Sequence, residues 1–159
     1  MIHLVRHGET APNRDRLALG RADPPLTDRG REQATRLAEV LASSGATLVV
    51  TSPLARARET GLCIAAALGI DVQIDTRLVE LDYGEWDERS FSEFPAADLA
   101  RWRKDASFAP PGGESLLAVG ERVASFCAET IGPDQVIAVS HVSPIKAAVL
   151  WAMNADPLL

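Results

Sequence analysis

Short aliphatic runs alternate with longer segments of helical periodicity, and this alternation limits the possible folds more than any other sequence feature. The runs TLVVT (47–51) and VIAVS (136–140) are almost wholly apolar, as expected of strands that are buried on both faces of a sheet. Ile2–Arg6 and Val72–Ile74 are shorter runs, and we expect the second at a sheet edge. Strands separated by helices predict an α/β fold, with three α/β/α layers and a mostly parallel central sheet.

Helix start and stop signals divide the segments between these strands. Thr27 is placed to cap one helix, which we expect to end before Gly45. Ser52 and Pro53 indicate the N-cap and the first residue of a second helix, which stops at Gly69. The predicted helices span about 27–43, 52–69, 96–104, 115–131 and 144–153.

The composition is that of an ordinary globular domain and argues against several functional classes. The 159 residues include 22 acidic and 16 basic ones, and the net charge of −6 disfavours a general nucleic-acid binder. Cys63 and Cys127 are too far apart to indicate a disulfide framework or a zinc ribbon. No apolar run approaches the ~20 residues that span a bilayer, and the first residues leave no room for a signal peptide. We expect one domain (1–159) in the cytoplasm, with no nucleic-acid or membrane partner.

Cationic and imidazole side chains follow three of the predicted strands. Arg6 and His7 end the first strand, Arg56 comes shortly after the second, and His141 directly follows the VIAVS run. Because the carboxyl ends of parallel strands meet at one edge of a sheet, we expect these groups to lie close together. The helix N-termini after these strands add unpaired N–H groups and a partial positive charge. Such a set of donors is suited to binding a phosphoryl group.

These residue types indicate phosphoryl transfer through a phosphoenzyme. A neutral imidazole can attack phosphorus while arginines hold the equatorial oxygens. A carboxylic acid is then needed to protonate the leaving oxygen and to activate water. Candidates lie in the acidic segment 80–88, and spacing alone does not choose among them. The motifs of competing chemistries (Cys-x5-Arg, Asp-x-Asp, a Walker A loop and HExxH) do not occur, so we expect neither a metal nor a cofactor.

At this point the sequence closely resembles the histidine phosphatase superfamily, the phosphoglycerate-mutase-like group. The motifs that carry the resemblance are RHGET (6–10) with Asn13, PLTDRG (25–30), TSPLARA (51–57), LVELDYGEW (78–86), PGGESL (111–116) and VSHV (139–142). The resemblance implies that His7 is the nucleophile, that Glu80 is the general acid and base, and that His141 completes the catalytic group. It further implies a phosphate-binding set, namely Arg6, Asn13, Gly20, Arg56 and Val142.

Three departures from the family pattern bear on these expectations. Leu19 stands where the family usually has a polar residue, which makes the mouth of the pocket more apolar. Asp87 and Glu88 replace the usual acid-glycine pair after Trp86, so a different turn is expected there. Family members usually continue after the last helix with a strand-bearing segment, so a sheet without its C-terminal strand is a further expectation.

The segment after the acid motif distinguishes two activities of this family. Mutases carry a long insertion there, whereas only 31 residues separate Glu80 from Gly112. A small cap segment, at about 82–112, leaves a phosphohistidine open to water and favours hydrolysis. We therefore expect a metal-independent phosphomonoester hydrolase, of the histidine acid phosphatase type.

Its expected partners are a small phosphorylated metabolite and inorganic phosphate as product, with a homodimer as an open expectation. The alternatives are a phosphoglycerate mutase that depends on 2,3-bisphosphoglycerate, and a non-catalytic binder of phosphorylated ligands. The sequence does not rank the candidate substrates.

Overall fold

The computed structural model describes residues 1–155 and contains a four-stranded parallel sheet. The strands are β1 (Ile2–Arg6), β2 (Leu48–Thr51), β3 (Val72–Ile74) and β4 (Val136–Ser140), in the order β1-β4-β2-β3. β4 therefore lies between β1 and β2, where all five of its residues are buried. The parallel sheet and the edge position of β3 confirm the predictions made from the aliphatic runs.

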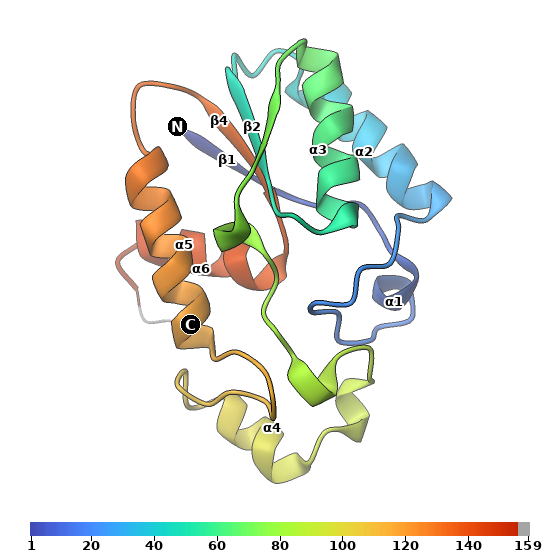
Figure 1. The fold of residues 1–159 in the computed structure, drawn as a ribbon, viewed down its shortest axis with the longest axis vertical. Helices are drawn as coiled ribbons and strands as arrows, with labels where there is room; N and C mark the ends of the chain where they lie inside the picture. The colour runs from blue at the N-terminus through green and yellow to red at the C-terminus, as the bar shows by residue number, and fades with distance from the viewer. Residues whose placement is uncertain (156–159) are drawn as a thin grey trace.

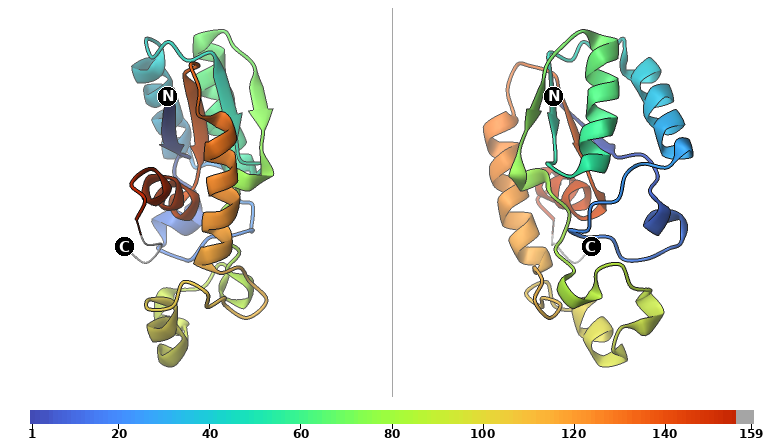
Figure 2. Two further views of the ribbon diagram at one scale, coloured as in Figure 1. Left: turned by 90° about the vertical axis from the view of Figure 1, so that its left-hand side faces the viewer. Right: turned by 45° about the vertical axis from the view of Figure 1, so that its right-hand side comes forward.

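Helices cover both faces of the sheet. They are α1 (Ala11–Arg14), α2 (Asp28–Leu41), α3 (Ala55–Leu68), α4 (Ala96–Trp102), α5 (Leu116–Thr130) and α6 (Val142–Ala152). In the left-hand view of Figure 2, α5 lies in front of the strands and α2 and α3 lie behind them. Neighbouring strand residues point to opposite faces, so Val49 packs in the core with α2 and α3, and Val50 packs in the core with α5. The predicted three-layer α/β/α architecture is confirmed.

Two of the predicted helix boundaries rest on capping residues that the structure shows in place. The Thr27 side chain accepts a hydrogen bond from the Gly30 backbone N–H at 3.0 Å and caps α2. Gly69 adopts the left-handed conformation, with φ at 67°, and ends α3. α2 itself ends at Leu41, earlier than predicted, and Gly45 (φ 72°) lies in the loop that follows.

The prediction that Ser52 and Pro53 begin α3 is wrong, because Ser52 still belongs to the end of the sheet. Its N–H donates to the carbonyl of Val139 at 3.0 Å, which extends the pairing of β2 with β4. The helix begins at Ala55, with Leu54 as its N-cap.

α6 also departs from its predicted start, since it begins at Val142 and not at residue 144. Pro144 lies inside the first turn of the helix. Backbone N–H groups in the first turn have no partner within the helix, so the absence of an N–H in proline costs no hydrogen bond there.

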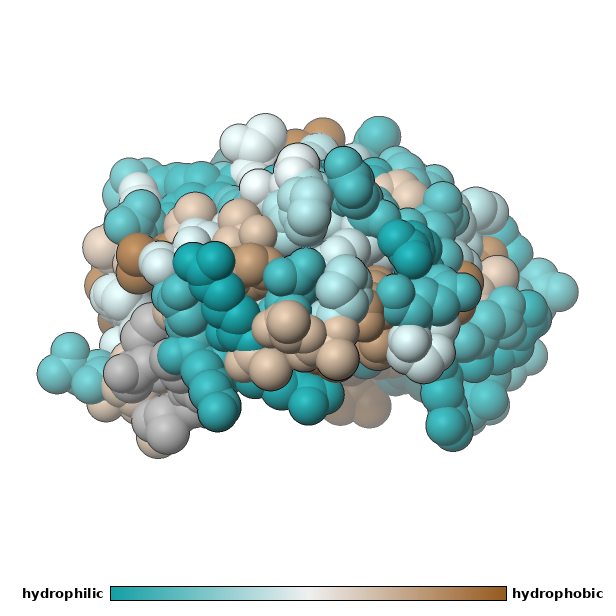
Figure 3. All heavy atoms as spheres, turned by 90° about the horizontal axis from the view of Figure 1, so that it is seen from below, coloured by the Kyte–Doolittle hydropathy of each residue, from teal (hydrophilic) through white to brown (hydrophobic). Residues whose placement is uncertain are grey.

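The cap segment, residues 82–112, lies beyond the carboxyl ends of the strands, at the bottom of Figure 1. It contains α4 and two short 3₁₀ helices, Gly84–Trp86 and Phe91–Glu93. Aromatic packing holds it together, with Trp86 stacked on Phe94 at a centroid distance of 4.4 Å. Figure 3 looks at the molecule from this end and shows apolar residues set among hydrophilic ones.

The last described residues, 153–155, add no strand after α6, and residues 156–159 lie outside the described part of the chain. The prediction of a sheet without a C-terminal strand can therefore be compared with the structure only up to residue 155. Among residues 1–155, no helix is both long enough and apolar enough to cross a membrane.

Candidate active site

Three strand ends bring two histidines and an arginine together at the carboxyl edge of the sheet. The rings of His7 and His141 lie 4.9 Å apart between centroids, at an interplanar angle of 57°. Arg56 and His141 are fully buried, and His7 is 8% exposed. The direct pairing of β1 with β4 places the two histidines side by side, because His7 follows Arg6 and His141 follows Ser140, its partner in register.

The environment of His7 determines which ring nitrogen is free. Nδ1 lies 2.7 Å from the Gly8 carbonyl oxygen, which can only accept, so Nδ1 carries the hydrogen and Nε2 keeps its lone pair. Burial lowers the pKa of His7 to about 4, and the charges of Arg56 and Arg6 act in the same direction. His7 is therefore a neutral imidazole with an unprotonated Nε2 at neutral pH.

His141 is held from β2. Its Nε2 lies 2.8 Å from the Ser52 hydroxyl, while its buried Nδ1 has no hydrogen-bond partner among residues 1–155. Burial lowers the pKa of His141 well below its ordinary value, and the nearby charge of Arg56 adds to this effect. The ring is therefore neutral at neutral pH.

Arg56 and Asp87 fasten the loop at residues 20–22 from two sides. Arg56 donates from Nη1 to the Ala22 carbonyl at 2.7 Å and from Nη2 to the Gly20 carbonyl at 2.8 Å. Asp87 accepts from the N–H groups of Gly20 at 2.6 Å and of Arg21 and Ala22 at 2.8 Å. The Nε of Arg56 is buried and has no partner in the described part of the chain. The Nε–H of this guanidinium is thus left for a ligand.

Gly20 contributes to the site through the position of this loop. Both of its backbone polar groups are bonded inside the protein, to Asp87 and Arg56. A Cβ at this position would lie 2.7 Å from the carbonyl oxygen of Leu81, so only glycine fits there. Its neighbour Leu19 is buried.

Glu80 is buried against the N-terminus of α6. Its carboxylate accepts from the N–H groups of Leu81 at 2.7 Å, Val142 at 3.1 Å and Ser143 at 3.2 Å. Burial raises the pKa of Glu80, although these hydrogen bonds oppose the change. A carboxyl group that retains its proton more readily than usual is suited to donate it. The N–H of Val142 is occupied by Glu80, and the Val142 side chain is partly exposed.

The two other predicted phosphate ligands lie near the surface. Arg6 ends β1 with its side chain exposed, and it has no hydrogen-bond or ion-pair partner among residues 1–155. Asn13 lies in α1, where its Oδ1 accepts from the Thr10 hydroxyl at 3.0 Å. This bond fixes the amide orientation and leaves the side-chain NH₂ free to donate.

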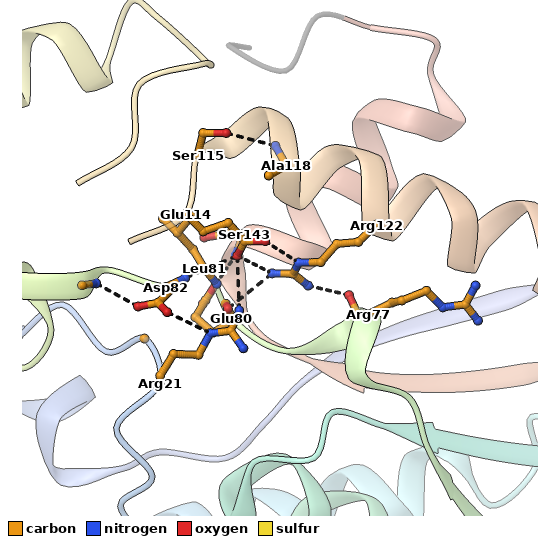
Figure 4. Close-up of polar contacts among 12 residues, drawn as sticks. Arg21, Arg77, Glu80, Leu81, Asp82, Glu114, Ser115, Ala118, Arg122 and Ser143 are labelled. Carbon is orange, nitrogen blue, oxygen red and sulfur yellow. Dashed lines mark hydrogen bonds and ion pairs between the residues drawn. The ribbon is translucent and has the colours of Figure 1, made fainter. Parts of the chain in front are cut away.

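Arg122 of α5 holds the backbone of the segment that carries Glu80 (Figure 4). Its guanidinium donates to the carbonyls of Arg77 at 2.5 Å and of Glu80 at 3.3 Å. Glu114 binds the same guanidinium with both carboxylate oxygens, at 2.9 and 3.0 Å. Arg21, from the loop that Arg56 anchors, also reaches Glu114, at 3.4 Å. One ion-pair network therefore connects this loop to the position of Glu80.

The family model of the histidine phosphatase superfamily (branch 1) matches residues 2–158. The chain belongs to the histidine phosphatase superfamily. The resemblance in the motifs is thereby confirmed at the level of the family, and the fold agrees with that of solved family members.

Named relatives of this superfamily include both phosphatases and mutases. The chain is 39% identical over 165 residues to a bifunctional protein of Mycobacterium tuberculosis, which covers 96% of this chain and 44% of that protein. It is 34% identical over 166 residues to a probable phosphoglycerate mutase of Salmonella paratyphi C, and the match covers 95% of this chain and 77% of that protein. The chain thus spans less than half the length of the first of these relatives.

A solved structure with the same fold is that of a mycobacterial glucosyl-3-phosphoglycerate phosphatase in complex with VO₃. Its TM-score is 0.88 at 33% identity, and the match covers 98% of this chain and 83% of the phosphatase. The histidine phosphatase fold therefore extends over nearly the whole chain.

Several residues that shape this histidine phosphatase site were not predicted from the sequence. Ser52 contacts His141, and Asp87 anchors the loop that Arg56 holds. Thr60 accepts from the Gly8 N–H at 3.1 Å and so fixes the turn after His7. The departure from the usual acid-glycine pair lies at Glu88, which adopts the left-handed conformation (φ 59°) directly after Asp87. No sequence feature connected Ser52, Thr60 or Arg122 to the site.

Proposed function

We propose that this protein is a metal-independent phosphomonoester hydrolase in which His7 becomes phosphorylated. The observation that carries the proposal is the hydrogen bond from Nδ1 of His7 to the Gly8 carbonyl, at 2.7 Å. It leaves Nε2 as a nucleophile with a lone pair, next to an arginine and a second histidine. The phosphatases among the relatives support the same class of reaction.

In the first step, Nε2 of His7 attacks phosphorus, and the bond from phosphorus to the leaving oxygen breaks. Glu80 gives its proton to that oxygen, so the alcohol leaves as a neutral molecule. The unpaired Nε–H of Arg56 and the side chains of Arg6, Asn13 and His141 hold the phosphoryl oxygens. The buried position of Glu80 supports the role of acid, because burial raises the pKa of its carboxyl group and so favours the protonated form.

In the second step, water attacks the phosphohistidine. Glu80, now ionised, takes a proton from this water as the P–N bond breaks. Orthophosphate is released, Nε2 of His7 regains its lone pair, and Glu80 is protonated again for the next turnover.

Hydrolysis is favoured over mutase activity by the size of the cap segment. The described cap contains one seven-residue helix, α4, and two three-residue 3₁₀ helices. A mutase must retain its substrate and exclude water until the phosphoryl group is returned. Assays with 3-phosphoglycerate, with and without 2,3-bisphosphoglycerate, compare the release of phosphate with the formation of 2-phosphoglycerate. A dominant isomerisation would establish the mutase alternative.

His7→Ala tests the nucleophile directly, with His3→Ala as the matched control. His3 lies on the same strand and bonds Gln135 at 3.3 Å. We expect the His7→Ala protein to lose phosphatase activity and to form no acid-labile, base-stable phosphoenzyme from a ³²P-labelled substrate. The His3→Ala protein keeps both properties, and EDTA leaves the activity of the unchanged protein intact. Turnover by a folded His7→Ala protein would contradict the proposal. If the unchanged protein formed no phosphoenzyme, the alternative of a non-catalytic binder would hold instead.

A further inference from the structure

Ser52 is fully buried just after β2, and its hydroxyl group meets the ring of His141. The Oγ atom of Ser52 lies 2.8 Å from Nε2 of His141. The backbone N–H of Leu54 donates to the same Oγ atom at 3.4 Å. Among residues 1–155 no other group bonds this hydroxyl, so Nε2 of His141 is the acceptor for its hydrogen.

The tautomer of the neutral His141 ring follows from this arrangement. If the hydroxyl donates, Nε2 accepts with its lone pair, and the ring hydrogen lies on Nδ1. Only Nδ1 is then without a partner in the described part of the chain. In the opposite tautomer Nε2 carries the hydrogen, and both Nδ1 and the hydroxyl hydrogen of Ser52 lack a partner there. Because each unpaired polar group in the interior is costly, the structure favours the hydrogen on Nδ1.

The two histidines of the site therefore present opposite groups to a ligand. Nδ1 of His7 donates to the carbonyl of Gly8, so Nε2 of His7 has a lone pair. Nε2 of His141 accepts from Ser52, so Nδ1 of His141 has a hydrogen to donate. The two ring centroids are 4.9 Å apart, so a single phosphoryl group can contact both rings. A lone pair is suited to phosphorus, and an N–H group is suited to one of its oxygens.

We propose that Ser52 is a positioning residue that holds His141 in the Nδ1–H tautomer, so that His141 binds the phosphoryl group as a neutral hydrogen-bond donor. Ser52 does not touch the substrate and acts only through His141. The role in binding the phosphoryl group rests on the proposed function, whereas the tautomer is a property of the free protein. The positive charge beside the phosphoryl group then comes from the arginines and not from this histidine. Burial, which lowers the pKa of His141 far below its ordinary value, agrees with an uncharged ring.

NMR of the ring nitrogens tests the tautomer without any substrate. The chain has three histidines, and with ¹⁵N-labelled histidine the variants His3→Ala and His7→Asn identify the signals of His141. Long-range correlations to the ring C–H groups then show which nitrogen of His141 carries the hydrogen. We expect it on Nδ1 at neutral pH. A hydrogen on Nε2, or on both nitrogens, would overturn the proposal.

Ser52→Ala removes the hydroxyl, and Thr51→Val is the matched control. Thr51 is equally buried, and its hydroxyl has no partner among residues 1–155. In Ser52→Ala nothing donates to Nε2, so we expect the Nε2–H tautomer of His141 to become populated. Inorganic phosphate should bind about tenfold more weakly, and kcat/KM for p-nitrophenyl phosphate should fall about tenfold. Thr51→Val should retain the tautomer, the affinity and the activity of the unchanged protein.

A double-mutant cycle shows whether Ser52 acts through His141. His141→Asn offers a neutral N–H group at the δ position but has no ring atom to accept from Ser52. We expect it to keep a kcat/KM about tenfold above that of His141→Leu, because a neutral donor is sufficient. Adding Ser52→Ala to His141→Asn should cause no further loss. A further tenfold loss would show that Ser52 supports the site independently of the ring, and equal activities of His141→Asn and His141→Leu would refute the neutral donor.

The outcomes separate this inference from the proposed function. If the unchanged protein forms a phosphohistidine, and Ser52→Ala has the same tautomer and phosphate affinity, the phosphatase stands and the role of Ser52 is refuted. If the protein hydrolyses no phosphomonoester, the proposed function fails. The NMR spectrum and the titration with inorganic phosphate then still decide whether Ser52 sets the tautomer and whether that tautomer strengthens the binding of the anion.

Discussion

At His7, burial and a single backbone carbonyl act on the same imidazole ring. The carbonyl of Gly8 selects the tautomer, and burial keeps the ring neutral by lowering its pKa to about 4. A nucleophilic ring needs both effects, since a protonated imidazole has no lone pair with which to attack. The same burial has a cost for the folded protein at low pH.

The stability of the protein should depend on pH through His7. The pKa of His7 is about 4 in the folded protein and 6.5 for a free histidine, so the unfolded chain binds the proton more readily. This contribution to stability is fully present above pH 6.5 and is lost as the pH falls toward 4, by about 3 kcal/mol. Urea unfolding at pH 7 and pH 4 measures the loss in the free energy of unfolding. This loss should be smaller for His7→Asn than for the unchanged protein, because all other groups titrate equally in both proteins. An identical loss in the two proteins would show that His7 is not held neutral.

Glu80 should be required to different extents in the two chemical steps. p-Nitrophenolate leaves without a proton, so the Glu80→Gln protein should still form the phosphohistidine from p-nitrophenyl phosphate. Hydrolysis of this phosphohistidine should slow about 10²- to 10⁴-fold, because no base activates the water. Rapid mixing should therefore show a burst of one p-nitrophenolate per active site. With alkyl phosphates both steps slow, and no burst appears.

The exposed Glu85 provides the control. Glu85→Gln should retain steady turnover without a burst. Unchanged hydrolysis by Glu80→Gln would transfer the role of acid and base to another residue.

At the level of elements, α5 acts on the site through the side chain of Arg122. Arg122→Met removes the donors to the carbonyls of Arg77 and Glu80 and leaves Glu114 without its bidentate partner. We expect a loss of about 2 kcal/mol in the free energy of unfolding and a lower kcat at unchanged pH optimum. Arg122→Lys should restore part of the stability, since lysine keeps the charge but not the forked geometry.

Arg36→Met, at an exposed position of α2, is the control for the loss of one positive charge. It should unfold at the same urea concentration as the unchanged protein. Equal effects at the two positions would mean that the Arg122 contacts do not position Glu80.

The elements of this fold were largely predictable because local signals and packing agree. The strands are buried aliphatic runs, and Thr27 and Gly69 act as the helix caps that their residue types indicate. The start of α3 was not predictable from Ser52, whose N–H pairs with β4 and whose hydroxyl contacts His141. Both partners are far away in the sequence, so the tertiary contacts decide the use of this serine.

The site was predictable to a similar extent. His7, Arg56 and His141 follow from the rule that the carboxyl ends of parallel strands meet. Glu80 could be chosen only by resemblance, since its burial depends on the N-terminus of α6. The contacts of Asp87 with residues 20–22 depend on a turn that the sequence does not specify.

For the whole molecule, the strand order predicts an order of local stability. β4 is paired on both sides, whereas β3 has three residues and pairs only with β2. Amide hydrogen exchange measured by mass spectrometry should be slowest in β4, because its amides open only with global unfolding. It should be fastest of the four strands in β3. Equal protection of β3 and β4 would indicate a sheet that opens as one unit.

The central place of β4 also affects how the chain matures during synthesis. Residues 136–140 separate β1 from β2, so these two strands cannot reach their final places before these residues have left the ribosome. His7 is therefore made long before its companion His141. A nascent chain that ends before residue 136 therefore holds His7 without the strand that places His141 beside it, and the proposed activity must wait for that strand.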